Sequence, residues 1–186
     1  MTLSESKDLD RLCTDYAQDP SKFAFFVGAG LSRPLFPSWK TLLLNLLAEC
    51  DATQVPYAEL EEVIKDGKDL LDAAELIVTH LGTAKYRRVL EHAFDIEIPQ
   101  EDQWPAGFNA LMDLEPRLLV TTNYDRLPEV IGRGLLSSYT SRTAAEAARA
   151  MASNRRVLMK LHGCITQQDS IILTRGEFAS LMHKQD

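Results

Sequence analysis

The feature that most constrains the fold of this chain is an apolar run that ends in a glycine turn. Residues 23–27 are Phe-Ala-Phe-Phe-Val, and Gly28-Ala29-Gly30 follows directly. Such runs are typical of strands in a parallel sheet, where helices cover both faces. Glycine permits a tight turn and lets a phosphate approach the backbone without meeting a Cβ atom. The segment predicts the strand–turn–helix unit of an α/β nucleotide-binding fold, although two glycines can also serve turn geometry alone.

Two later segments show the same pattern. Residues 118–120 are Leu-Leu-Val and lead into the sequence Thr-Thr-Asn-Tyr-Asp at 121–125. Residues 157–161 are Val-Leu-Met-Lys-Leu and lead into His162-Gly163. Ligands bind at the carboxyl ends of the strands in open α/β sheets. We therefore expect the three polar clusters to converge on one crevice.

Alternating strands and helices predict a Rossmann-like parallel sheet with helices on both faces. A helical insertion at about 56–94 follows the first strand–helix unit, broken near Gly67 and Gly82. It is either a lid over the pocket or a plain helical layer. The pattern predicts strands at 22–27, 117–122, 156–161 and 170–174, and helices at 5–17, 38–50, 57–64, 69–80, 83–93, 104–114, 126–131, 143–152 and 177–183.

The three motifs together resemble those of the sirtuin family, in which G-A-G-x-S, T-x-N-x-D and H-G line the NAD pocket. The sequence is most similar to the sirtuin-like NAD hydrolases of bacterial anti-phage defence proteins, which show T-T-N-Y-D, L-H-G and a P-S-W after the glycine turn. Here the last of these is Pro37-Ser38-Trp39. The likeness spans roughly residues 23–181. It implies that residues 1–186 form one sirtuin-like NAD-binding domain, and we expect a longer chain to continue after it.

The resemblance implies a reaction at the nicotinamide–ribose bond with two catalytic residues. Asn123 would hold the nicotinamide ribose and position water. His162 would act as the general base, because an imidazole exchanges protons near neutral pH. The NAD-binding residues that the resemblance implies are Gly28, Ala29, Gly30, Ser32, Thr122, Asn123, Asp125 and His162.

Several of these residues have simpler interpretations. Ser32 would place a hydroxyl near the phosphate or the ribose, or it is an ordinary turn residue. Asp125 would hold the loop or contact the nicotinamide carboxamide, and aspartate is also favoured as a helix N-cap. We expect Tyr124 to serve packing, and Cys164 to be a small residue in a packed turn rather than a nucleophile.

Composition excludes several functional classes. The net charge is −7 and the pI is about 5.1, which argues against a nucleic-acid surface because phosphate binding needs clustered Lys and Arg. No apolar run approaches the ~20 residues that span a bilayer. The first ten residues are polar and acidic and do not form a secretory signal. We therefore expect a cytoplasmic protein.

The cysteines predict that the domain holds no zinc. Cys13, Cys50 and Cys164 are far apart and form no C-x-x-C pair. This departs from the protein-deacylating sirtuins, which carry a small zinc module with paired C-x-x-C motifs. Deacylase activity is therefore the least favoured hypothesis.

Two hypotheses of different classes remain. The first is an NAD hydrolase that releases nicotinamide and ADP-ribose, as an NAD-depleting effector of bacterial anti-phage defence. The second is a non-catalytic module that senses NAD or ADP-ribose and regulates a partner domain. The presence of both Asn123 and His162 favours the enzyme. A homo-oligomer, a further effector or sensor domain, or a partner protein is expected, and the activating trigger is open.

Overall fold

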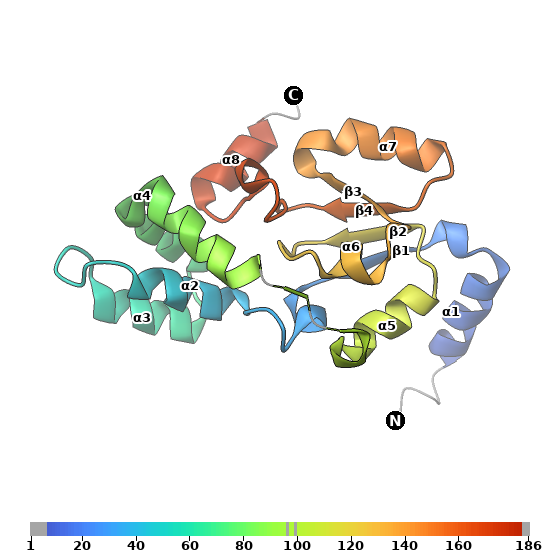
Figure 1. The fold of residues 1–186 in the computed structure, drawn as a ribbon, viewed down its shortest axis with the longest axis horizontal. Coiled ribbons are helices and arrows are strands. Elements are labelled where there is room, and N and C mark those ends of the chain that lie inside the picture. The colour runs from blue at the N-terminus through green and yellow to red at the C-terminus, as the bar shows by residue number, and fades with distance from the viewer. Residues whose placement is uncertain (1–6, 96, 99, 184–186) are drawn as a thin grey trace.

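A four-stranded parallel sheet forms the centre of the computed structural model, which describes residues 7–95, 97–98 and 100–183 (Figure 1). All neighbouring strands pair in parallel, in the order β1-β2-β4-β3. Helices flank this sheet, so the predicted α/β, Rossmann-like architecture is confirmed. The strands are β1 (Ala24–Val27), β2 (Leu118–Thr121), β3 (Ser137–Thr140) and β4 (Val157–Lys160).

The register brings the carboxyl ends of the four strands to one level. Val27 pairs with Thr121, Thr121 with Lys160, and Lys160 with Thr140. Each of these residues is the last of its strand. The glycine turn, the Thr-Thr-Asn-Tyr-Asp segment and the Leu-His-Gly segment therefore leave the sheet along the same edge, as expected for parallel strands.

The two faces of the sheet are buried against different helices. Because side chains alternate along a strand, Leu119 and Leu158 enter the main core, which also holds Phe108 of α5 (Ala106–Asp113). Val157 and its half-buried neighbour Met159 point to the other face and pack with the alanines of α7 (Ala144–Ala152). The sheet is thus covered by helices on both sides.

The helical insertion, α3 (Tyr57–Asp66) and α4 (Leu70–Phe94), forms a lobe beside the sheet together with α2 (Trp39–Ala48), the helix of the first strand–helix unit (Figure 1). Leucines 42, 43, 46 and 47 of α2 are all buried. Gly67 ends α3 with a φ of 78°, and Gly82 interrupts α4 with a φ of 70°. Both predicted breaks are therefore present, but the second divides one long helix into two arms.

The other helices are close to their predicted positions. Tyr16 of α1 (Lys7–Gln18) packs on Phe23 with ring centroids 5.1 Å apart. The first two residues of the predicted helix at 5–17 lie outside the described residues. The remaining helices are α6 (Leu127–Ile131) and α8 (Arg175–His183), and short 3₁₀ turns lie at Pro20–Lys22, Ala29–Ser32, Glu101–Gln103, Ser141–Thr143 and Gln168–Ser170.

One predicted strand was wrong, and one strand was missed. Residues 171–174 are buried but form no strand and pair with no described strand, so their apolar character comes from packing in the core. The fourth strand is instead β3, whose sequence is Ser-Ser-Tyr-Thr. It is an edge strand that pairs with β4 alone among the described strands. An edge strand can expose polar side chains, and for this reason it lacks the apolar run used to identify the others.

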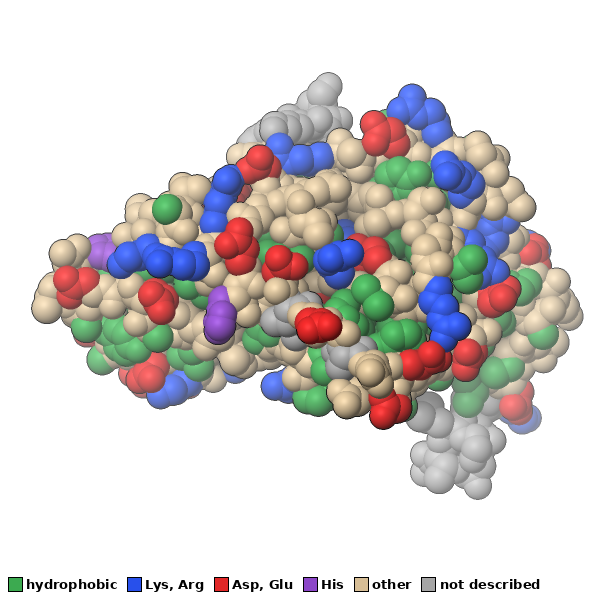
Figure 2. Space-filling model, in the orientation of Figure 1, with side chains coloured by type: hydrophobic (Ala, Val, Ile, Leu, Met, Phe, Trp, Pro, Cys, Tyr) green, Lys and Arg blue, Asp and Glu red, His purple; other side chains and the backbone are tan. Residues whose placement is uncertain are grey.

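The surface mixes charges of both signs. On the face shown in Figure 2, Asp and Glu side chains are interspersed with Lys and Arg. That the domain binds no nucleic acid stays a prediction. In the described part of the chain, no helix is both long and apolar enough to cross a membrane.

Candidate functional site

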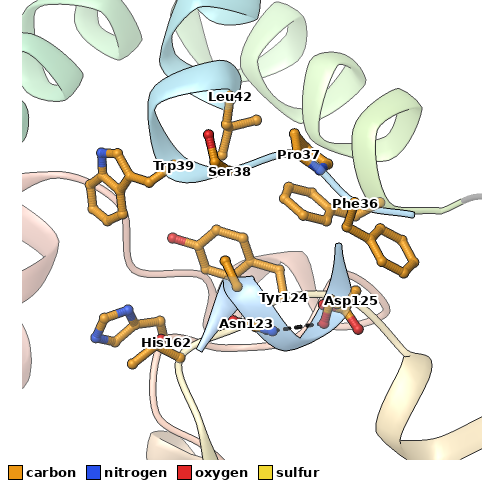
Figure 3. Close-up of a pocket in the computed structure, with 13 residues that line it drawn as sticks. Phe36, Pro37, Ser38, Trp39, Leu42, Asn123, Tyr124, Asp125 and His162 are labelled. Atoms are coloured by element: carbon orange, nitrogen blue, oxygen red, sulfur yellow. Dashed lines mark hydrogen bonds between the residues drawn. The ribbon is translucent and has the colours of Figure 1, made fainter. Parts of the chain in front are cut away.

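A cavity of about 140 Å³ lies where the three motifs leave the sheet. Figure 3 shows residues 36–39 and Leu42 on one side of it, and residues 123–125 with His162 on the other. Its volume is below the ~300–1,000 Å³ of typical ligand clefts, so it suits a ring-sized group rather than a whole dinucleotide. The lining residues are Ala29, Ser32, Phe36, Pro37, Ser38, Trp39, Leu42, Phe94, Thr122, Asn123, Tyr124, Asp125 and His162.

Six of the eight predicted NAD-binding residues line this cavity, and the two glycines do not. Gly28 and Gly30 are exposed beside it, and a Cβ atom added to either would meet no described heavy atom within 4 Å. Gly28 is extended, with φ −125° and ψ −173°, and neither glycine has a positive φ. Neither packing nor backbone conformation therefore requires glycine at these positions. The absence of side chains leaves bare backbone at the edge of the cavity.

A side-chain hydrogen bond joins the glycine-turn motif to the Thr-Thr-Asn-Tyr-Asp motif. Asn123 Nδ2 donates to Ser32 Oγ at 2.9 Å (Figure 3). The backbone N–H of Asn123 donates to Thr121 Oγ1 at 3.0 Å. Ser32 is only 1% exposed, so its hydroxyl is directed at Asn123 rather than into open space. These bonds fix the Asn123 amide at the wall of the cavity.

Asp125 is buried directly behind this pair. Its Oδ1 accepts a hydrogen bond from the N–H of Leu127 at 3.0 Å, which satisfies a donor in the first turn of α6. The N-cap of α6 is Arg126, so Asp125 lies one residue before the predicted N-cap position but still hydrogen-bonds the start of the helix. Burial raises the pKa of the Asp125 carboxyl, and the nearby Lys160 ammonium opposes that rise.

His162 lies two residues beyond the end of β4, on the same side of the cavity as Asn123 (Figure 3). Its half-buried ring packs edge-to-face on Phe178 of α8, with centroids 5.0 Å apart. Burial lowers the pKa of the imidazole below its ordinary value of 6.5. The ring is therefore neutral at pH 7 and can accept a proton. The next residue, Gly163, has a φ of 93° and turns the chain back at once.

Aromatic residues that sequence reasoning did not select complete the wall. Phe36 stacks on Phe94 with centroids 6.0 Å apart, and Phe94 meets the Tyr124 ring edge-to-face at 5.4 Å. The Tyr124 hydroxyl donates to the carbonyl of Ile172 at 2.8 Å, which agrees with the packing role expected of it. Phe94 ends α4, so the helical insertion reaches the cavity. Whether the insertion acts as a lid stays open, and no local sequence signal marked Phe36 or Phe94.

The cysteines are dispersed, as their spacing indicates. Cys13 is exposed, Cys50 is half-buried and Cys164 is buried. Cys164 does not line the cavity, which agrees with its interpretation as a small residue in a packed turn. Among the described residues, no group of three or more His, Cys, Asp and Glu side chains could hold a metal ion. That the domain binds no zinc stays a prediction.

Comparison with known proteins supports the resemblance. Residues 117–186 match the model of the SIR2-like domain family. This span contains Asn123 and His162, whereas the glycine turn precedes it. Among curated proteins, none matches the chain. The match supports a sirtuin-like domain with the motifs at 121–125 and 161–163, and it indicates an NAD-related function.

Proposed function

We propose that this protein hydrolyses NAD at the nicotinamide–ribose bond and releases nicotinamide and ADP-ribose. The observation that carries the proposal is the meeting of Asn123 and His162 at one cavity, with the bare backbone of Gly28 and Gly30 beside it. Cleavage of this bond passes through an oxocarbenium-like state, as in glycoside hydrolysis. The site must therefore hold the ribose, direct water to its anomeric carbon and accept a proton from that water.

The shape of the site supports binding NAD by one end. The cavity has about the size of a single ring and is lined by aromatic side chains, which suit the nicotinamide. The pyrophosphate would then lie outside the cavity, against the backbone of Gly28 and Gly30. No side chain would obstruct it there, because the space above both glycines is open.

The two catalytic residues have complementary properties. The side-chain amide of Asn123 donates an N–H to the Ser32 hydroxyl. The amide oxygen of Asn123 is therefore left to accept a hydrogen bond from the ribose or from water. His162 is neutral at physiological pH because burial lowers its pKa, so it can take the proton of the attacking water. Water adds its oxygen to the ribose carbon, and the bonding electrons leave with nicotinamide.

Chromatography of nicotinamide and ADP-ribose after incubation with NAD tests the proposal. His162→Ala and Asn123→Ala should each abolish turnover, since loss of a general base typically costs about 10²–10⁴-fold in rate. His92→Ala is the matched control, because His92 is exposed on α4 and outside the cavity. Near-normal turnover by His162→Ala would refute the role of His162. NAD binding without products would favour the sensing module instead.

The proposal extends to the biological setting. The similarity of the motifs to sirtuin-like defence proteins supports an NAD-depleting effector of bacterial anti-phage defence that acts in the cytoplasm. Because unrestrained hydrolysis would exhaust the cell's own NAD, we expect activity to depend on self-association or on a partner. Turnover per protomer, measured over a dilution series of the protein, tests this. Activity that does not vary with concentration or added partner would contradict it.

A further inference from the structure

Lys160 is a lysine without access to solvent at the centre of the sheet's carboxyl edge. It ends β4 and is 0% exposed. An ammonium group is costly to bury unless it is paired and hydrogen-bonded. Lys160 meets both conditions. Its Nζ donates to the backbone carbonyl of Asp125, lies 3.4 Å from the carbonyl of Tyr124, and forms an ion pair with Glu129 Oε1 at 3.1 Å.

These contacts connect both halves of the candidate catalytic pair. Tyr124 and Asp125 are the two residues that follow Asn123. Nζ also lies 3.3 Å from the sulfur of Cys164, two residues beyond His162. Lys160 itself lies two residues before His162. One buried ammonium therefore contacts the segment that carries Asn123 and the turn that carries His162.

The register explains how a single side chain reaches both segments. Lys160 pairs with Thr121 across the central strands, so its side chain lies beneath the residues that follow Thr121. The 122–126 segment, here called the Asn123 loop, has no regular secondary structure. Its Tyr124 carbonyl also accepts the N–H of Ile165 at 3.0 Å, which adds a second tie to the turn after His162.

We propose that Lys160, with Glu129 as its counterion, is a positioning residue that holds the Asn123 loop at a fixed place relative to His162. The inference rests on the proposed function for its effect on catalysis, but its structural part is independent. An apolar side chain of similar length could fill the same space. It could not donate to backbone carbonyls, so it would leave the loop untethered while the core stayed filled.

The test removes both charges together. In Lys160→Met/Glu129→Gln neither side chain carries a buried unpaired charge, and such replacements are often tolerated in protein interiors. We expect the variant to fold, with faster amide hydrogen exchange across residues 122–127. We expect kcat for NAD to fall by on the order of 10²-fold, as a misplacement of about 1 Å can cause.

Lys65→Met/Glu61→Gln is the matched control. It removes a lysine–glutamate pair of similar length, 3.0 Å, from the exposed face of α3. Both kcat and exchange in 122–127 should match the unmodified protein. Should Lys160→Met/Glu129→Gln not fold, Lys160→Gln carries the same two readouts, because its shorter amide cannot reach the Asp125 carbonyl.

The two readouts separate this proposal from the proposed function. If the unmodified protein does not hydrolyse NAD, the exchange measurement still decides whether Lys160 holds the loop. A folded variant with normal exchange in 122–127 and normal kcat would overturn the proposal. A proportional loss of protection over the whole domain, with no separate effect at 122–127, would also overturn it, because Lys160 would then serve only global stability.

Discussion

Gly163→Ala should be among the most damaging small substitutions in this chain. Gly163 has a φ of 93°, and an alanine Cβ there would lie 2.3 Å from the Ser170 carbonyl oxygen and 2.6 Å from the Ile171 nitrogen. Both are backbone atoms, and real Cβ atoms essentially never approach closer than 3.0 Å. Either the turn after His162 or the segment at 170–171 must therefore move.

The expected loss in the free energy of unfolding of Gly163→Ala has two parts. A left-handed conformation costs a non-glycine residue about 1–2 kcal/mol. Overpacking of a buried site adds about 1–3 kcal/mol. The free energy of unfolding should therefore fall by about 2–5 kcal/mol, out of the ~5–15 kcal/mol typical of a domain. At about 2–4 °C per kcal/mol for a domain of this size, the melting temperature should fall by roughly 4–20 °C.

Urea unfolding followed by circular dichroism measures this effect. Gly134→Ala is the control, because Gly134 also has a positive φ, 76°, but its Cβ would meet no described atom within 4 Å. It should lose only the conformational part, about 1–2 kcal/mol. Equal losses in the two variants would show that the contact with Ser170 relaxes freely, and the packing argument would be refuted. Gly163→Ala should also reduce turnover, since Ile172 N–H donates to the His162 carbonyl at 2.9 Å and a shift of either segment displaces the histidine.

Three further predictions concern the site. Gly30→Ala should leave the melting temperature unchanged, because its Cβ meets open space, but should weaken NAD binding in calorimetry; unchanged affinity would place the pyrophosphate elsewhere. The acidic limb of kcat/KM against pH should have its midpoint below 6.5, because burial lowers the pKa of the His162 base and its neutral form persists to lower pH; a midpoint at or above 6.5 would argue against that assignment. Elemental analysis of the dialysed protein should find no stoichiometric zinc, and one zinc per chain would disprove the prediction from the scattered cysteines.

The parts of the fold that sequence reasoning identified are those in which local pattern and tertiary environment agree. β2 and β4 are short apolar runs because a central strand of a parallel sheet is covered on both faces, and β1 is apolar too, although it is an edge strand whose Phe26 is exposed. Once these strands are parallel, their polar carboxyl ends must lie together. The convergence of Asn123 and His162 on one cavity thus follows once the segments that precede them are recognised as parallel strands.

The parts that were missed depend on partners far away in the chain. Residues 171–173 are apolar because the core surrounds them, and β3 is polar because it is an edge strand, so hydrophobicity identified the wrong segment as the fourth strand. Phe94 reaches the cavity only through the path of a helix interrupted at Gly82. The buried contacts of Lys160 arise from pairing across the sheet, and an isolated strand sequence gives no sign of them.

The position of β1 makes the glycine turn less stably held than the segments that carry Asn123 and His162. Among the described strands β1 pairs with β2 alone, and its Phe26 side chain is 67% exposed, whereas the strands that precede Asn123 and His162 are each paired on both sides. A strand opens locally most easily where it is hydrogen-bonded to one neighbouring strand only and its side chains are poorly buried. The glycine turn should therefore detach from the sheet at lower cost than the catalytic segments. A ligand that contacts both the glycine turn and the catalytic segments stabilises the state in which β1 is paired with β2. Ligand binding should therefore reduce local opening of β1 more than that of the interior strands β2 and β4.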